Sequence, residues 1–543
     1  PEGRLVPMRV EPIRVVSCLA PCSVRQLPSG AAVSDFGQNL AGVVQLRMHG
    51  LTPGTCVTLR FSEVITPDGE LNTENLRTAQ QCDVYLARGG EETYCPRFTY
   101  HGFRYAEISG LPDPLAAEDV CALVLRSDVA SRGSFDSGEP LINDIQRICR
   151  WTESNNLHSV PTDCPQRDER LGWTGDAQVF IRTACLNFDA ERFFTKWLAD
   201  LAADQREDGA VGHVIPNVLH QSGSAAWDDA ATICPWVVYL AYGDPNILRA
   251  QFASMKKWVD YITAHTTTKD LWTGGEHYGD WLGLDAPSGS YKGSSRENLI
   301  ASAFYAHSTA LVIKAGRVLG QDISAYEALY ERIVRAFRQA YPVYQTQTEC
   351  TLAVYFALAE DTQKTADQLA QMIRSCGTKL QTGFVGTPYL LRALSENGYT
   401  DLAYTLLLQT EFPSWLYPVT RGATTMWEHW DGLKPDGSMW SADMNSFNHY
   451  AYGAVGEWMF NVCAGIQPDP ENPGFRRIRF APQPDPRMGH VSASIRTAQG
   501  LVASSWAYEG DKVRYTFTVP AGCTAVAQIG GAEYELSAGV HRF

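Results

Sequence analysis

The stretch Ser137-Gly138-Glu139-Pro140 marks the point where the sequence passes from one structural pattern to another. It offers a helix start, because proline is favoured near the first helical position. Leu141, Ile145, Ile148 and Trp151 then follow at the three- and four-residue spacing of a buried helix face. We therefore expect β-structure before this point and a helical body after it.

The first 127 or so residues predict short β-strands. Alternating apolar and polar residues occupy 43–48, 56–61, 83–86 and 105–108, and the turn-rich Leu51-Thr52-Pro53-Gly54 separates the first two runs. Short strands at this spacing are typical of a β-sandwich.

Helical patterns recur between residues 137 and 463. They are seen at 194–201, 258–262, 299–319, 326–337, 352–358 and 390–408. About a dozen such helices alternate with long loops that contain Gly and Trp, which favours an α/α toroid. A solenoid would need a clear repeat motif, and none is found.

The pattern returns to β-structure after the proline-rich segment that begins at Pro468, and 513–519 alternates cleanly. We therefore predict a multidomain, mainly α protein. Its domains are a β-sandwich at 1–127, a helical catalytic domain at 128–465 and a second β-sandwich at 466–543.

Size, charge and cysteine usage limit the possible functions. A chain of 543 residues suggests two to four packed units. A net charge of −15 without a basic run argues against nucleic acid or an anionic membrane surface as partner, and no apolar run is long enough to span a bilayer. The 14 Cys form no CxxC pair and no metal-ligand cluster, so we expect reduced, buried thiols and a cytoplasmic rather than a secreted protein. Oligomeric state has no signal in the sequence.

The segment from Asp163 to Asp176 concentrates four acids, two Arg and one Trp within 14 residues. Pro165, Gly172 and Gly175 interrupt it, so the backbone is expected to be a loop that directs several carboxylates at one place. Sugar hydrolysis needs such a place, with a protonated acid, carboxylates that bind hydroxyl groups and an aromatic wall. The alternative is a charged surface loop paired by its own Arg167 and Arg170, and composition does not decide between the two.

A second segment places Glu428 between Trp427 and Trp430. An acid beside two Trp suits a sugar pocket, but an amphipathic turn with buried Trp fits the composition equally well. Weaker signals come from Trp227, which precedes two Asp, from Asp280 beside Trp281, and from His449 in the polar segment 445–450.

The residues Asp163-Cys164-Pro165-Gln166-Arg167-Asp168-Glu169-Arg170-Leu171-Gly172-Trp173-Thr174-Gly175-Asp176 resemble the signature of the bacterial α-L-rhamnosidases, glycoside hydrolase family 78. The resemblance continues in 422–431 and 448–458, and it covers roughly residues 30 to 540. It implies an (α/α)6 barrel between N-terminal and C-terminal β-sandwich domains.

The resemblance also implies roles for individual residues. Glu169 matches the general acid and Glu428 the general base. Hydroxyl ligands are implied at Asp163, Arg167, Asp176 and His449, an aromatic wall at Trp173, Trp227 and Trp281, and a weaker substrate contact at Asp280.

The function implied is inverting hydrolysis of terminal α-L-rhamnose from an oligosaccharide or plant glycoside, with no metal or organic cofactor required. One alternative is another inverting (α/α)6 glycosidase that acts on a different sugar. A second is a non-catalytic sugar-binding protein, which would need neither an acid nor a base; the presence of both Glu169 and Glu428 argues against it.

Overall fold

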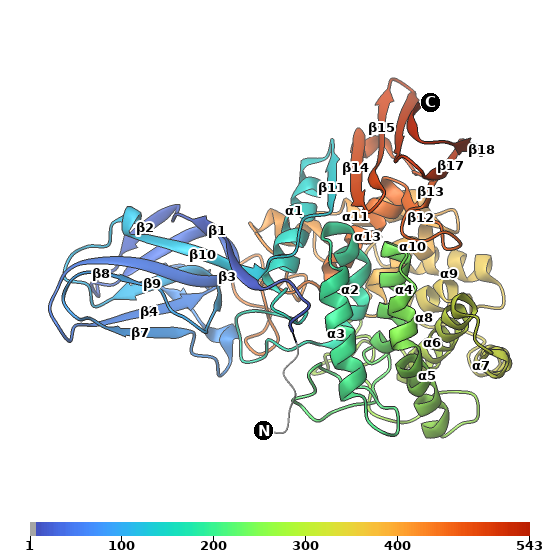
Figure 1. Ribbon diagram of the computed structural model, residues 1–543, viewed down its shortest axis with the longest axis horizontal. Helices are drawn as coiled ribbons and strands as arrows, with labels where there is room; N and C mark the ends of the chain where they lie inside the picture. Colours follow the sequence, from blue (N-terminus) through green and yellow to red (C-terminus); the bar gives the residue numbers. More distant parts are fainter. Residues whose placement is uncertain (1–6) are drawn as a thin grey trace. The chain divides into compact units, whose positions relative to one another are not determined.

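The computed structural model describes residues 7–543, which form helices and substantial sheets (Figure 1). The chain divides into two compact units, and each is built from several segments. Of the described residues, the first unit contains 7–128, 147–171 and 417–450; the second contains 129–146, 172–416 and 451–543. A division that cuts the chain in this way means that residues far apart in sequence meet within one unit.

The first unit is built on an eight-stranded sheet with the order β1-β10-β3-β9-β4-β7, in which β2 and β8 also pair with β3. The four alternating runs of the sequence lie in β3, β4, β7 and β9, so these strand predictions are confirmed. The strands are β1 (Ile13–Leu19), β2 (Ser23–Gln26), β3 (Ala32–Leu51), β4 (Cys56–Ser62), β7 (Cys82–Leu86), β8 (Gly90–Tyr94), β9 (His101–Ser109) and β10 (Val120–Ser127).

The core of this sheet is made by apolar side chains of neighbouring strands. Leu40 and Val44 of β3, Leu59 and Phe61 of β4 and Phe103 of β9 are fully buried and belong to one cluster. Alternation places every second side chain of a strand on the same face, which is why these runs were recognisable in the sequence.

Six helices of the second unit pack against one another in a closed ring. Each contacts the next, and the last contacts the first. In ring order they are α2 (Thr174–Asn187), α4 (Ala230–Tyr242), α6 (Glu297–Leu319), α8 (Gln347–Tyr355), α10 (Thr387–Ser395) and α13 (Val455–Trp458).

Five further helices pack against members of this ring: α3 (Glu191–Asp204), α5 (Asn246–His265), α7 (Ser324–Ala340), α9 (Thr362–Ser375) and α11 (Thr400–Leu407). The chain also contains α1 (Pro140–Asn155), which begins at the predicted proline, and the short α12 (Leu416–Thr420).

Two helix predictions need correction. The stretch 390–408 is not one helix but α10 and α11, because Gly398 between them takes a left-handed φ of 84° that an α-helix cannot continue through. Helix α8 ends at Tyr355, before the predicted Leu358, since Ala357 also has a positive φ of 57°.

The C-terminal part of the second unit contains two sheets, β11-β14-β15-β16-β19 and β12-β13-β17-β18. Phe480 of one sheet stacks on Phe517 of the other with 4.6 Å between ring centroids. The strands are β11 (Gly133–Ser137), β12 (Ile466–Pro468), β13 (Arg477–Phe480), β14 (His490–Thr497), β15 (Gly500–Glu509), β16 (Lys512–Val519), β17 (Thr524–Ile529), β18 (Ala532–Leu536) and β19 (Gly539–Arg542).

Two simpler expectations are settled by the described residues. Within 7–543, no helix is both long and apolar enough to cross a membrane. All 14 cysteines are free thiols, and seven of them are buried. The prediction of buried thiols is wrong for four, which are exposed: Cys18, Cys22, Cys56 and Cys82.

Candidate active site

The predicted loop is confirmed for residues 163–171 of the first unit but is wrong for Thr174, Gly175 and Asp176, which form the first turn of helix α2 in the second unit. Asp163 and Leu171 exchange two hydrogen bonds: the Asp163 amide donates to the Leu171 carbonyl at 3.0 Å, and Asp163 Oδ1 accepts from the Leu171 amide at 2.9 Å. Asp163 is buried, so its carboxylate fixes the base of the loop. The two ends of the loop are therefore fixed, and residues 164–170 extend between them.

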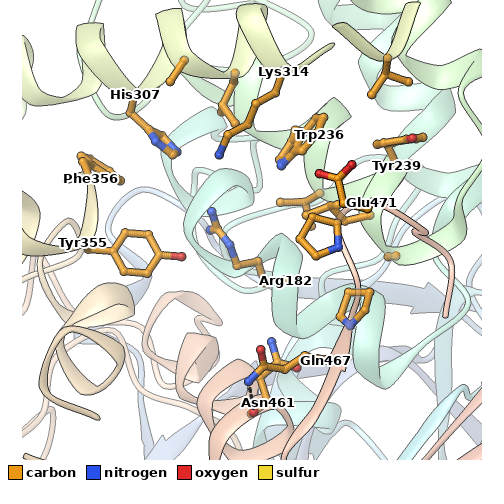
Figure 2. A pocket seen from close by; sticks show the side chains of 18 of the residues that line it. Arg182, Trp236, Tyr239, His307, Lys314, Tyr355, Phe356, Asn461, Gln467 and Glu471 are labelled. Carbon is orange, nitrogen blue, oxygen red and sulfur yellow. Dashed lines mark hydrogen bonds between the residues drawn. The ribbon is translucent and has the colours of Figure 1, made fainter. Parts of the chain in front are cut away.

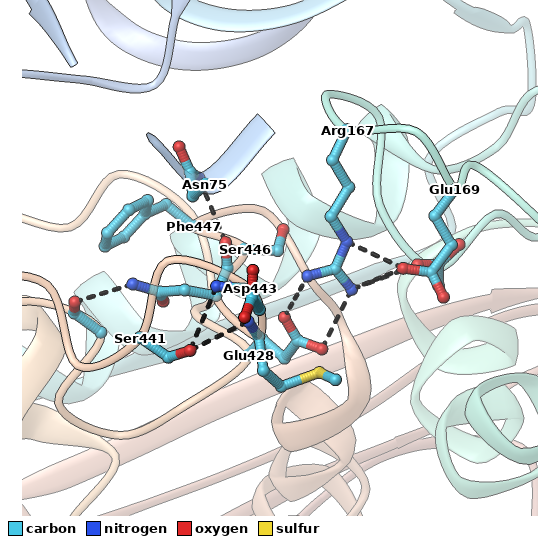
Figure 3. A network of polar contacts seen from close by, with 12 residues as sticks. Asn75, Arg167, Glu169, Glu428, Ser441, Asp443, Ser446 and Phe447 are labelled. Atoms are coloured by element: carbon cyan, nitrogen blue, oxygen red, sulfur yellow. Dashed lines mark hydrogen bonds and ion pairs between the residues drawn. The ribbon is translucent and has the colours of Figure 1, made fainter. Parts of the chain in front are cut away.

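Arg167 lies between the two predicted catalytic carboxylates (Figure 3). Its Nη1 and Nη2 donate to the two oxygens of Glu428 at 2.7 and 3.1 Å, and its Nε donates to Glu169 Oε2 at 2.8 Å. A planar guanidinium suits such a two-sided arrangement because its donors form a rigid fork. The loop therefore brings Glu169 and Glu428 together although they are far apart in the sequence.

The surroundings of Arg167 rule out the surface-loop alternative. The Arg167 side chain is only 2% exposed. Arg170 donates to the Tyr100 carbonyl at 2.8 Å and to Gln81 Oε1 at 3.2 Å. A charged surface loop would instead keep its arginines in water.

Glu428 is held by the chain segment that carries His449. The Glu428 amide donates to the Ser446 carbonyl at 2.8 Å, and the His449 amide donates to the Met426 carbonyl at 2.9 Å. Burial acts to raise the pKa of Glu428, but the charges of Arg167 and His449 outweigh it, so this pKa lies below its ordinary value. An ionised carboxylate results, as a general base requires.

The alternative prediction for this segment, that its tryptophans are buried, is also confirmed. Trp427 and Trp430 are 4% and 1% exposed. Trp427 packs with Tyr417, Ala423 and Phe447 in a small apolar cluster. The two readings of the sequence are therefore compatible, since the aromatic rings form the support while Glu428 contacts Arg167.

A metal ion is not needed to balance the charge of this loop. Asp163, Cys164 and Glu169 each place a potential ligand atom within 4.8 Å of the others. However, Arg167 Nη2 lies 3.8 Å from Asp163 Oδ2 and 2.8 Å from Glu169 Oε2, so a guanidinium already supplies the positive charge. Burial also raises the pKa of the Cys164 thiol well above its usual range, which disfavours a thiolate ligand.

Two ionisable residues of the N-terminal sheet domain, the part of the first unit before residue 128, contact the segments that carry Glu428 and Glu169. Neither was predicted from the sequence. Glu63 accepts hydrogen bonds from Asn39 Nδ2 at 2.8 Å, Asn75 Nδ2 at 2.9 Å and the Phe447 amide at 3.1 Å. Burial raises the pKa of Glu63 to about 7, although these hydrogen bonds oppose the shift. Arg77 Nη2 donates to Glu169 Oε2 at 2.8 Å. No local sequence pattern marks either residue.

The predicted aromatic residues of the second unit surround one tyrosine. Tyr278 contacts Trp227, Trp173 and Trp281, with ring centroids 4.7, 5.7 and 5.8 Å away. His213 Nδ1 lies 2.9 Å from the Tyr278 hydroxyl. Tyr278 was missed, and its position three residues before Trp281 was the available signal.

Asp176 and Asp280 lie elsewhere in the second unit. Asp176 is buried in the first turn of α2. Asp280 is also buried, and its carboxylate accepts from the amides of Gly383, Val385 and Gly386 at 2.8, 2.9 and 3.1 Å and from the Thr348 hydroxyl. Burial raises the pKa of Asp280. These bonds give Asp280 a structural role at the start of α10, and its contact with substrate stays a prediction.

A separate cavity of about 1200 Å³ opens at the C-terminal ends of the ring helices (Figure 2). Arg182, His307 and Lys314 are among the side chains that point into it. None of the predicted site residues lines it. Trp173 and Trp227, by contrast, lie at the N-terminal ends of α2 and α4, so this cavity is distinct from the aromatic cluster around Tyr278.

Three family models cover almost the whole chain. Residues 130–463 match the bacterial α-L-rhamnosidase 6 hairpin glycosidase domain, 25–126 match the concanavalin-like domain and 465–543 match the C-terminal domain. The chain therefore belongs to the bacterial α-L-rhamnosidase family.

Individual relatives agree with this assignment. An α-L-rhamnosidase of Streptomyces avermitilis is 39% identical over 98% of this chain and 53% of its own length. An α-L-rhamnosidase of Alteromonas sp. is 37% identical over 96% of this chain and 58% of its own. The chain thus spans little more than half the length of these curated relatives.

Solved structures show the same similarity. The crystal structure of the Streptomyces avermitilis α-L-rhamnosidase complexed with L-rhamnose has a TM-score of 0.94 at 38% identity, over 99% of this chain and 54% of that chain. Native α-L-rhamnosidase from Aspergillus terreus has a TM-score of 0.93 at 35% identity, over 98% of this chain and 64% of that chain.

Proposed function

We propose that this protein hydrolyses terminal non-reducing α-L-rhamnosides with inversion at the anomeric carbon. The observation that carries the proposal is Arg167, which brings Glu169 and Glu428 together on one guanidinium inside a family of α-L-rhamnosidases. The substrate is a rhamnose-containing oligosaccharide or plant glycoside. A reducing compartment is part of the proposal and is supported by the free thiols.

The finer architecture belongs to the same proposal. We take the closed ring of six helices, with further helices packed against it, as an (α/α)6 barrel between two β-sandwich domains. The corresponding domains are 1–127, 128–465 and 466–543.

In the proposed reaction Glu169 gives a proton to the glycosidic oxygen while Glu428 takes one from the attacking water. The C–O bond to the leaving group breaks as the water oxygen bonds to the anomeric carbon. Asp163, Asp176 and His449 bind sugar hydroxyls, and Trp173, Trp227 and Trp281 contact the apolar face of the ring. Arg167 orients both carboxylates and binds the sugar when its contact with Glu428 opens.

In the proposed reaction Arg167 releases Glu428 and keeps its contact with Glu169. Glu169 and Glu428 both contact Arg167 Nη2, at 2.8 and 3.1 Å. The carboxyl groups of inverting pairs typically stand roughly 6.5–9.5 Å apart, which leaves room for the attacking water. The entering sugar and water take the place of the contact between Arg167 and Glu428.

Proton NMR of the first-formed product tests this mechanism. With p-nitrophenyl α-L-rhamnoside we expect β-L-rhamnose first, before mutarotation mixes the anomers. Glu428→Ala should abolish hydrolysis while rhamnose affinity changes by no more than about tenfold. First-formed α-L-rhamnose would overturn inversion and the base role of Glu428, and rhamnose binding without turnover by the unmodified protein would favour a sugar-binding protein.

A further inference from the structure

Arg77 connects the N-terminal sheet domain to the carboxylate proposed as the proton donor. It follows the short 3-10 helix η1 (Glu74–Leu76), and its side chain is 26% exposed. Arg77 Nη2 donates to Glu169 Oε2 at 2.8 Å, and Nε lies 2.7 Å from Asp168 Oδ1. One side chain therefore contacts two neighbouring acids of the loop.

Asp168 makes the connection between loop and sheet domain more rigid. It accepts hydrogen bonds from the Thr78 amide at 3.2 Å and from the Thr78 hydroxyl. Burial opposes ionisation of Asp168, but the Thr78 bonds and the Arg77 charge prevail, and the pKa of Asp168 is lowered. Asp168 is thus an anion that helps to hold Arg77 in place.

The backbone at this contact is constrained on both sides. Arg77 has φ 55° and Arg170 φ 58°, values that cost a non-glycine residue about 1 kcal/mol or more. Gly102 of β9 approaches the loop so closely that a Cβ would lie 2.7 Å from Gln166 Cβ and 2.8 Å from the Gln166 nitrogen. The sheet domain therefore sets where Arg77 meets Glu169.

The contact gathers positive charge at one oxygen of Glu169. Oε2 accepts from Arg77 Nη2 and from Arg167 Nε, both at 2.8 Å, and Arg167 Nη2 lies 2.8 Å from the same oxygen. Two guanidinium groups therefore meet at Glu169 Oε2, and hydrogen bonds to a charged partner are stronger than those between neutral groups.

We propose that Arg77 is a positioning residue that, together with Arg167, holds Glu169 in place and stabilises the negative charge that Glu169 gains as it gives up its proton. The inference rests on the proposed function. When Glu169 gives its proton to the glycosidic oxygen, the negative charge left on the carboxylate is met at Oε2 by two guanidinium groups. The leaving group departs as a neutral alcohol, so charge and protons balance.

The experiment compares leaving groups, because proton donation matters most where the leaving oxygen is basic. For Arg77→Met we expect kcat/KM to fall about 10- to 100-fold on methyl α-L-rhamnoside, the usual effect of losing one charge-assisted hydrogen bond, and by no more than about threefold on p-nitrophenyl α-L-rhamnoside. Arg77→Lys should restore part of the loss on the methyl glycoside.

Arg60→Met is the matched control. Arg60 lies in β4 of the first unit and pairs at the surface with Glu107 at 3.2 Å, so turnover of neither substrate should be affected. Melting temperatures of all variants are measured alongside. If Arg77→Met does not fold, the loss of kcat/KM on the methyl glycoside is compared with the loss on the p-nitrophenyl glycoside in Arg77→Lys. Equal losses on both substrates, or no loss on either, would overturn the role proposed for Arg77. If the wild type still turns over both substrates, that result leaves the proposed function unchanged. Absence of turnover in the wild type would overturn both.

Discussion

At the scale of single residues, Arg167 and Glu63 are ionisable side chains buried in the first unit. Arg167 is 2% exposed and shares its donors between Glu169 and Glu428. Glu63 is buried among three hydrogen-bond donors. A buried charge is tolerated only when partners compensate it, so each of these residues depends on contacts made by distant parts of the chain.

The acid role of Glu169 predicts a leaving-group effect in its own variant. Glu169→Gln should lower turnover of methyl α-L-rhamnoside by at least ~10²-fold, the usual scale for loss of a general acid. The loss should be smallest for p-nitrophenyl α-L-rhamnoside, because a good leaving group needs little protonation. Initial rates on both glycosides check this, and equal losses would count against the acid role.

Glu63 predicts a pH-dependent contribution to stability. Its pKa is about 7 in the folded protein and ordinarily 4.5, so the folded state binds the proton more tightly. The contribution of Glu63 is then most favourable below pH 4.5 and is lost as pH rises towards 7. Between pH 5 and 8 the stability of the wild type relative to Glu63→Gln should fall by ~3 kcal/mol. Urea unfolding at several pH values measures this difference, and a difference that is constant or rises with pH would show that Glu63 is ionised throughout.

At the scale of elements, the ring helices depend on how the loops before them are held. The Asp280 carboxylate accepts hydrogen bonds from three backbone amides of the turn that leads into α10, those of Gly383, Val385 and Gly386. Thr348 of α8 donates to the same carboxylate. Asp280 therefore joins the N-terminal ends of two neighbouring ring helices, where a negative charge is favoured by the helix dipoles.

Asp280→Ala should consequently destabilise the helical unit by at least ~3 kcal/mol, because several buried donors lose their acceptor at about 1 kcal/mol or more each. Thermal melting followed by circular dichroism measures the effect. Asp285→Ala, in the same loop but partly exposed, serves as the control and should cost about 1 kcal/mol or less. Unchanged melting with weakened rhamnose binding would instead support the substrate contact predicted for Asp280.

At the scale of the whole molecule, Arg132 links the ring helices to the C-terminal sheets within the second unit. It is buried, and its Nη1, Nη2 and Nε donate to the carbonyls of Cys185, Ala241 and Arg496 at 2.6, 2.8 and 3.0 Å. Its guanidinium also lies 4.2 Å from the Tyr242 ring centroid. The carbonyls belong to α2, α4 and β14, so one side chain joins three elements.

Arg132→Met should lower stability by at least ~3 kcal/mol and loosen the C-terminal sheets from the helices. Hydrogen exchange of β14 and β15 should become faster while that of α6 changes less. Arg132→Lys should rescue poorly, because an ammonium group cannot reach three carbonyls in one plane. Arg496→Met is a control, since Arg496 contributes only its carbonyl to this contact. Wild-type exchange in β14 of Arg132→Met would contradict the linking role.

The sequence by itself determined the order of β, helical and β segments and both acidic motifs. The alternation at 43–48 and 56–61 and the helix start at Pro140 depend on the spacing of residues close together in the sequence, which does not change with tertiary contacts. The roles proposed for Glu169 and Glu428 come from the resemblance of their motifs to a family signature.

Only the tertiary structure decided which groups meet. Arg77 and Glu63 join the carboxylate loops, β11 pairs with β14 and Tyr278 lies among three Trp. None of these contacts follows from periodicity, because each joins residues whose separation in sequence is set by the path of the chain. Burial pattern is a local property of a sequence, whereas the partner of a buried charge is a property of the fold.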